Sequence, residues 1–311
     1  MLLYGIGCVL LIGLFVFGST IKGATSWYSF GSFSFQPVDV MKIGLILLLA
    51  KYLSKRHVEI ARVKHLIITG IYTFIPFSLV VIQPDFGSSM VIGAIWFGTL
   101  LLSGLSRKHL LIMTGIVLVT GVIFWNFVFA TYQKERIETF LHPTADVLGS
   151  GYNSYQSMVA VGSGKILGKG VGYGSQSRLQ FLPENQTDFI FASFAEEWGF
   201  VGSFLVLVLF AFLIASMIRI ALSAISAFDM IIVLGVIIML STHVIINIGM
   251  NLGILPVTGL GLPFMSYGGS HLIIECIAVG MVASIARFRV RVRHSTEIQN
   301  EFLGYAKPLR P

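Results

Sequence analysis

The stretch Phe200-Val-Gly-Ser-Phe-Leu-Val-Leu-Val-Leu-Phe-Ala-Phe-Leu-Ile-Ala-Ser-Met-Ile218 contains no charged side chain. A helix needs about 20 predominantly apolar residues to cross a bilayer. Comparable apolar runs recur along the chain, at 2–20, 37–53, 66–83, 87–105, 109–129, 194–218, 228–250 and 269–288. An open sheet leaves backbone polar groups unsatisfied in lipid, so the sequence predicts an all-α, polytopic transmembrane bundle of about eight spans.

The composition excludes a soluble globular domain, because 55 % of the residues are hydrophobic and only 11 % are charged. The net charge of +7 is concentrated in segments that fall on one side of the predicted bundle. The positive-inside rule makes that side the cytoplasm and places both termini there. The basic clusters are Lys51, Lys55, Arg56, Arg62 and Lys64; Arg107 and Lys108; and Arg287, Arg289, Arg291 and Arg293. The basic tail is expected to anchor to anionic lipid at the membrane surface rather than to bind nucleic acid.

The chain is expected to form one membrane domain, residues 1–290, followed by a basic cytoplasmic tail, 291–311. Two irregular segments should emerge on the outer face. The first is the extracytoplasmic loop at about 130–193, whose length indicates a functional segment. The second, 251–270, is rich in glycine and proline, which exclude a regular helix. Irregular backbone at membrane depth is tolerated where it lines a cavity. A functional site is therefore expected on this face.

Three carboxylates of an otherwise acid-poor chain lie on one short segment, namely Glu184, Asp188 and Glu196. A carboxylate at a membrane boundary is costly unless it is solvated, paired or used. A chemical role and an ordinary solvated loop end or helix cap are both compatible with this spacing. The nearby segment Gly162–Gly170 lacks the spacing of a phosphate-binding loop, although Lys165 or Lys169 could still meet a phosphate.

Other polar residues lie within or beside the apolar runs. Asp39 and Lys42 share one helix face, and a lysine at this depth is usually functional, although a mutually neutralising pair is the alternative. Asp85 is predicted to cap the next helix.

Further along the chain, His243, Asn247 and Asn251 share another helix face, where interhelical hydrogen bonds are the default. Glu275, four residues after His271, should have a partner. The two cysteines, Cys8 and Cys276, give neither a disulfide framework nor metal-ligand spacing.

Taken together, these residues resemble the SEDS family (RodA/FtsW/SpoVE), the polytopic peptidoglycan glycosyltransferases, over nearly the whole chain. The ordered motifs that carry the resemblance are Gly23-Ala24 with Trp27, Gln36-Pro37 with Lys42, Gln83-Pro84-Asp85-x-Gly87, Gly151-Tyr152, Gln156-Ser157, Gly162–Gly164, Gly168–Gly170, Leu182–Glu184, Thr187–Phe191, Glu196-Glu197, Asn247–Met250, Leu255–Gly259 and Leu262–Ser270. Their context is more similar to the RodA elongation type than to the division type.

The chain departs from the family pattern at several positions. Ser26 replaces an arginine, Val38-Asp39 replaces Ser-Glu, Gln186 replaces a histidine, and Lys165 stands where glycine is common. The family typically has ten spans, so the chain is expected to lack the first two transmembrane helices.

The resemblance implies polymerisation of lipid II into β-1,4-linked glycan strands, with inversion, at the outer face of the bacterial cytoplasmic membrane. It makes Asp188 the candidate catalytic base, and Lys42 and Arg136 the candidate partners of the lipid diphosphate. No metal site and no cofactor are evident, although a divalent cation could assist the diphosphate. The substrate-binding candidates are Lys42, Asp39, Gln36, Trp27, Arg136, Gln156, Ser157, Lys169, Glu184, Thr187, Glu196 and Ser266.

The resemblance also implies a class B penicillin-binding protein, a transpeptidase, as partner. The alternatives are a flippase for a lipid-linked precursor, for which buried charges are also suited, and a non-catalytic scaffold that activates the transpeptidase. A division or sporulation role within the same family is a further alternative.

Overall fold

The computed structural model describes residues 1–21, 24–30, 33–55, 63–104, 107–123, 125–126, 131–142 and 151–302. Gly23, Arg56, Arg62 and the last nine residues of the predicted basic tail lie outside these ranges. The elements near the N-terminus are α1 (Leu2–Phe17), β1 (Ser19–Ile21), β2 (Ala24–Phe30), β3 (Phe33–Phe35), α2 (Pro37–Ser54), α3 (Val63–Ile82), α4 (Phe86–Leu102) and α5 (Arg107–Ile123). They are followed by α6 (Thr131–Leu141), α7 (Tyr152–Ser163), α8 (Ser175–Arg178), α9 (Ile190–Leu222), α10 (Ala227–Asn251) and α11 (Gly269–Phe302).

Eight helices, α1–α5 and α9–α11, lie at the eight apolar runs of the sequence, which confirms the predicted helical membrane architecture. Among the described residues, four helices are long and apolar enough to cross a membrane: α3, α9, α10 and the Gly269–Phe288 part of α11. The helices α1 and α4 are apolar but only 16 and 17 residues long. The protein is therefore an integral membrane protein, while a count of eight crossings stays a prediction.

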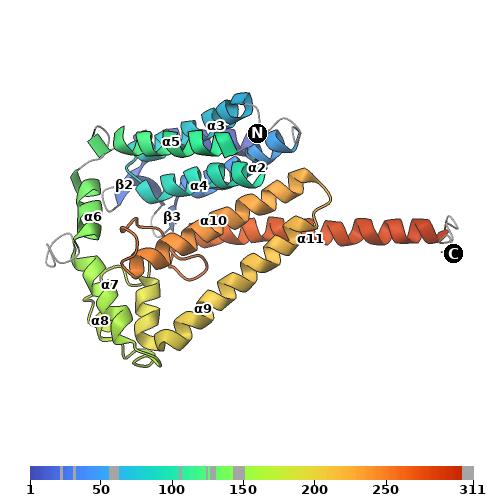
Figure 1. Cartoon of the computed structure of the whole chain (residues 1–311). Helices are drawn as coiled ribbons and strands as arrows, with labels where there is room; N and C mark the ends of the chain where they lie inside the picture. The colour runs from blue at the N-terminus through green and yellow to red at the C-terminus, as the bar shows by residue number, and fades with distance from the viewer. Residues whose placement is uncertain are drawn as a thin grey trace.

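The core of the bundle is built around α2 and α10 (Figure 1). Of the most apolar window of α10, 72 % is buried, against 22 % for α9 and for α11. The two central helices approach closely because α10 carries glycine at the contact: a Cβ at Gly235 would come within 2.7 Å of Ile46 Cγ2. Small residues permit such close packing of membrane helices. The helices α4, α9 and α11 then pack around this pair.

A small antiparallel sheet accompanies the helical bundle. The strands pair in the order β1-β2-β3 between α1 and α2, with Ser19 opposite Trp27 and Tyr28 opposite Phe35. Tyr28 Oη also donates a hydrogen bond to the Leu10 carbonyl, 2.9 Å away, which ties the sheet to α1. These short strands are compatible with a helical membrane protein, since they pair with one another in the connection between two helices.

The predicted long loop contains much regular structure. The helix α6 runs down one end of the bundle and connects α5 with α7 (Figure 1), and α9 begins at Ile190, earlier than the expected 194. Helix α9 is broken at Gly199, where φ is 65° and ψ is −162°. The segment 165–170 satisfies backbone groups at the break: Lys169 N donates to Glu196 O across 3.0 Å, and Phe200 N donates to Lys165 O across 2.9 Å.

Candidate active site

Asp188 lies two residues before α9, where the predicted extracytoplasmic loop at about 130–193 (the outer segment) joins the bundle. Asp188 is partly exposed, whereas the next residue, Phe189, is buried. Two carboxamides of α10 hold the Asp188 carbonyl: Asn247 Nδ2 donates to it across 2.9 Å and Asn251 Nδ2 across 3.1 Å. The backbone of the candidate base is therefore fixed to α10, one of the two central helices of the bundle.

The two asparagines form a buried platform beneath this segment. Asn251 Oδ1 accepts from the backbone N of Ala192 across 2.9 Å, and Asn247 Nδ2 also donates to the Leu260 carbonyl across 2.7 Å. Both side chains are completely buried. The interhelical hydrogen bonding expected from their four-residue spacing is found, and the contact with Asp188 is an addition that no local pattern indicates.

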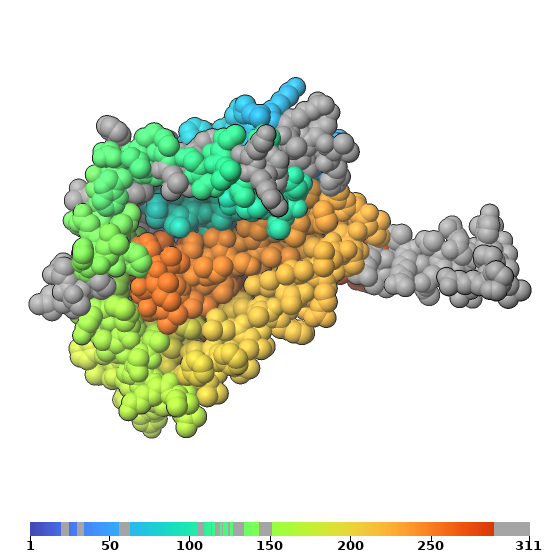
Figure 2. Space-filling view, viewed as in Figure 1, coloured from blue at the N-terminus to red at the C-terminus, as the bar shows by residue number. Residues whose placement is uncertain are grey.

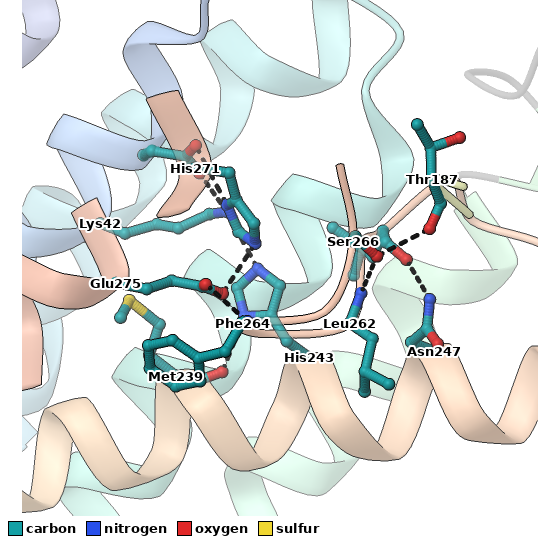
Figure 3. A network of polar contacts seen from close by, with 12 residues as sticks. Lys42, Thr187, Met239, His243, Asn247, Leu262, Phe264, Ser266, His271 and Glu275 are labelled. Atoms are coloured by element: carbon teal, nitrogen blue, oxygen red, sulfur yellow. Dashed lines mark hydrogen bonds and ion pairs between the residues drawn. The ribbon is translucent and has the colours of Figure 1, made fainter. Parts of the chain in front are cut away.

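The connection from α10 to α11, residues 252–268, closes over the same segment. Ser266 Oγ donates to the Thr187 carbonyl across 2.7 Å and accepts from Leu262 N at the same distance (Figure 3). Tyr267 N donates to the Gln186 carbonyl across 2.8 Å. The two irregular segments of the sequence thus meet, and in the space-filling view (Figure 2) the 252–268 connection reaches the surface beside α6.

Arg136 brings a cation to this connection from α6. Its Nη1 lies 3.4 Å from the Val257 carbonyl. Two residues further, at Gly259, a Cβ would lie 3.9 Å from Asp188 Oδ2. Arg136 and Asp188, which come from different parts of the outer segment, therefore both contact or closely approach the 252–268 connection.

Asp39 and Lys42 belong to a buried polar network rather than to an open surface. Lys42 Nζ lies 2.9 Å from Asp39 Oδ1 and 3.2 Å from His243 Nε2, and only 2 % of the lysine is exposed. Both side chains are enclosed in this conformation, and their contact with substrate stays a prediction.

Helix α11 extends the same network. His271 Nδ1 lies 3.2 Å from Asp39 Oδ2, and its Nε2 lies 2.9 Å from Glu275 Oε1 (Figure 3). His271 is the most accessible member of the network, with 17 % of its side chain exposed. His243, His271 and Glu275 were not among the site residues predicted from sequence. Their only sequence signal is the rarity of ionisable side chains inside membrane helices.

Glu196 and Ser157 are also buried, and their predicted contact with substrate stays a prediction. The Glu196 carboxylate is 0 % exposed and accepts from Lys169 Nζ across 2.7 Å, and further donors come from Ser175, Gln176 and Ser177. Ser157 Oγ donates to the Asn251 carbonyl across 2.8 Å. Glu196 thus fastens the outer segment to α9, and Ser157 fastens α7 to α10.

The remaining predicted site residues lie in several different elements. Thr187 Oγ1 donates to Glu184 Oε2 across 2.7 Å, next to Asp188. Gln36, at the start of α2, donates from Nε2 to Asp85 Oδ2 across 3.1 Å, and Asp85 caps α4 as predicted, through Ser88 N. Trp27 lies in β2 and Gln156 in α7, both partly exposed. No described contact joins these two residues to Asp188.

Among the described residues, no group of three or more His, Cys, Asp or Glu side chains is placed to hold a metal ion. The assistance of a divalent cation therefore stays a prediction that these residues do not test.

Comparisons with known proteins give a consistent identification. Over 289 residues, which are 92 % of this chain and 77 % of the relative, the sequence is 42 % identical to the peptidoglycan glycosyltransferase MrdB of Escherichia coli. A chain in a solved structure described as "Structural coordination of polymerization and crosslinking by a peptidoglycan synthase complex" superposes with a TM-score of 0.78 and 34 % identity. The match covers 92 % of this chain and 80 % of that one.

A crystal structure of the rod shape determining protein RodA from Thermus thermophilus superposes with a TM-score of 0.67 and 31 % identity, over 92 % of this chain and 77 % of that one. The family model FtsW/RodA/SpoVE, described as "Cell cycle protein", matches residues 1–291. The chain belongs to the FtsW/RodA/SpoVE family.

Proposed function

We propose that the protein polymerises lipid II, with Asp188 as the general base. The relative from Escherichia coli is named as a peptidoglycan glycosyltransferase, and this chain is a cell-wall glycosyltransferase of the same family. The observation that carries the proposal is the partly exposed Asp188, whose carbonyl is held by Asn247 and Asn251 at the outer end of the bundle. General base catalysis requires such a positioned carboxylate within reach of the proton it removes.

In the proposed reaction, Asp188 accepts the proton of the acceptor's GlcNAc 4-hydroxyl as that oxygen attacks C1 of the donor's MurNAc. The new bond joins the hydroxyl oxygen to C1, and the bond from C1 to the diphosphate oxygen breaks. Undecaprenyl diphosphate leaves with the bonding electrons. Attack opposite to the leaving group converts the α-linked donor into a β-1,4-linked product.

The test of this function is an assay of the purified chain with labelled lipid II, with and without its transpeptidase. We expect a ladder of glycan products from the wild-type protein. Movement of lipid II across vesicle membranes without a ladder would instead support the flippase. A ladder made only by an added polymerase, and stimulated by this chain, would support the scaffold.

The polymerase needs a cation for the charge that develops on the leaving diphosphate. Arg136 is the better-placed candidate, because it is partly exposed beside the 252–268 connection, whereas Lys42 is enclosed by Asp39 and His243. Contact of Lys42 with the diphosphate requires the buried network to open. Arg136 thus supplies the cation on the accessible side of the site.

We expect Arg136→Gln to weaken the use of lipid II by about tenfold, which corresponds to about 1.4 kcal/mol at 25 °C. Steady-state polymerisation over a range of lipid II concentrations measures the change. The control is Arg178→Gln, which removes the same charge from an exposed position in α8. Equal kinetics for the two variants would remove Arg136 from the diphosphate site.

The proposed partner is a class B penicillin-binding protein. The similarity to a chain from a complex described as coordinating polymerization and crosslinking supports this partner. We further propose a role in elongation and rod shape, supported by the similarity to the rod shape determining protein RodA. Copurification with the transpeptidase encoded by the same organism, and the loss of rod shape after depletion of this chain, test the two proposals separately.

The proposed location is the bacterial cytoplasmic membrane, with Asp188 on the extracytoplasmic face and both termini in the cytoplasm. The asymmetry of the basic residues supports this orientation. In a variant that lacks Cys8 and Cys276, a cysteine at Tyr173, which is 72 % exposed, should react with an impermeant reagent in intact cells. A cysteine at Lys55 should react only after the cells are opened. The reverse pattern would place Asp188 in the cytoplasm.

A further inference from the structure

Glu275 is a buried carboxylate of α11 that the proposed reaction does not use. Only 2 % of it is exposed, and it lies in the Gly269–Phe288 part of α11, which is long and apolar enough to cross a membrane. Its Oε2 accepts a hydrogen bond from the backbone N of Phe264 across 2.9 Å, and its Oε1 lies 2.9 Å from His271 Nε2. An ionisable group at such a position is costly and indicates a function.

The backbone that Glu275 holds is in an uncommon conformation. Phe264 has φ of 61°, in the left-handed region that non-glycine residues rarely adopt. Its side chain is 39 % exposed, so packing of the phenyl ring is a weak constraint on the turn. A backbone conformation of this kind persists only where surrounding contacts fix it, and the Phe264 N–H to Glu275 hydrogen bond is one such contact.

The same turn carries the contacts that reach the candidate base. Leu262, on one side of Phe264, is fully buried and donates its N–H to Ser266 Oγ. Ser266 in turn donates to the carbonyl of Thr187, the residue before Asp188 (Figure 3). A continuous series of contacts therefore leads from Glu275 through the Phe264 turn and Ser266 to the peptide that precedes Asp188.

We propose that Glu275 is a positioning residue for Asp188 and acts by accepting the Phe264 N–H hydrogen bond. The inference rests on the proposed role of Asp188 as the base. His271 lies between the two carboxylates, with Nε2 2.9 Å from Glu275 Oε1 and Nδ1 3.2 Å from Asp39 Oδ2. The required property of Glu275 is an acceptor oxygen at this position.

The variants Glu275→Gln and Glu275→Met separate the acceptor oxygen of Glu275 from its charge. Both are neutral and of similar length, but only glutamine can accept from Phe264 N. We expect Glu275→Met to lower kcat for lipid II polymerisation by about ten- to a hundredfold, since small misplacements of reacting groups have effects of this size. Its KM should stay near the wild-type value, because no substrate contact is removed. Glu275→Gln should retain most of the wild-type kcat.

Amide hydrogen exchange gives a readout independent of activity. Exchange in the peptide covering 258–268 should be faster in Glu275→Met than in Glu275→Gln. Cys276→Ala is the control, because this neighbouring residue is exposed on the outer surface of the same helix. It should change neither the exchange nor the kinetics.

A second substitution tests the strain at the turn directly. Glycine adopts φ of about 60° without penalty, so Phe264→Gly should restore part of the activity lost in Glu275→Met. This double variant also serves as the test if Glu275→Met alone does not fold. Near-wild-type kcat in Glu275→Met, equal losses in the Gln and Met variants, or no rescue by Phe264→Gly would each overturn the proposal.

Failure of the underlying function looks different. If Asp188→Asn polymerises lipid II at the wild-type rate, the assignment of the base is wrong whatever Glu275 does. If Asp188→Asn is inactive while Glu275→Met has wild-type kcat and wild-type exchange in 258–268, the base stands and only the positioning role is wrong.

Discussion

Asp188→Asn is expected to lower the rate of lipid II polymerisation by about 10²–10⁴-fold, the usual contribution of a positioned acid–base group. Asparagine keeps the shape of the side chain but cannot accept the proton of the attacking hydroxyl. The contacts of Asn247 and Asn251 are made to the backbone carbonyl, so they should survive the substitution. Binding of labelled lipid II and copurification with the transpeptidase should therefore remain, while the glycan ladder disappears.

The two neighbouring carboxylates provide the controls. Glu184→Gln should retain activity, because Glu184 is exposed and its contact with Thr187 needs only an acceptor oxygen. Glu196→Gln should act through stability, since its carboxylate is enclosed by Lys169 and the α8 segment. An active Asp188→Asn protein beside an inactive Glu184→Gln protein would move the base to Glu184. Activity in all three variants would remove base catalysis from this segment.

Lys42→Met is expected to destabilise the folded protein by about 3 kcal/mol or more, because removing one member of a buried ion pair leaves the other charge uncompensated. Asp39 keeps a contact with His271, which limits the loss. Thermal unfolding in detergent, followed together with polymerisation activity, measures the effect. The double variant Asp39→Asn with Lys42→Met removes both charges and should recover most of the lost stability.

The recovery is what distinguishes a structural lysine from a substrate-binding one. If Lys42→Met has wild-type stability but needs much more lipid II for the same rate, the lysine contacts the substrate after all. If the double variant is as unstable as the single one, the ion pair with Asp39 does not account for the effect. Because Lys42 also lies 3.2 Å from His243, His243 would then be the partner to test.

The helices could be predicted because a membrane-spanning helix needs a long apolar run, and each such run is visible in the local sequence. The sheet at β1–β3 could not, since its strands of 3 to 7 residues are stabilised mainly by pairing with one another. The capping role of Asp85 was readable for the same local reason: the donor, Ser88 N, is only three residues away.

Part of the candidate site could be predicted from the sequence. Asp188 stood out through its neighbours in the chain, and its partly exposed position agrees with a role in chemistry. The burial of Lys42 was not readable, because His243 comes from a helix 201 positions later. For Glu275, the spacing of four residues indicates the contact with His271, but not the contact with the Phe264 N–H in a turn with positive φ. Contacts between separate segments decide the cases that local spacing does not encode.

The break of α9 at Gly199 is bridged on both sides by the segment 165–170. Backbone hydrogen bonds join residues 169 and 170 to Glu196 and Glu197 before the break, and residues 165 and 166 to Phe200 and Val201 after it. A Cβ at position 199 would collide with the backbone of Gly168 and Ile166, which leaves glycine as the residue that fits. Kinks of this kind let a helix change direction at one point. Because Phe200 N and Val201 N donate to the Lys165 and Ile166 carbonyls, a tilt of the part of α9 from Phe200 onward would be transmitted to the outer segment that leads to Asp188.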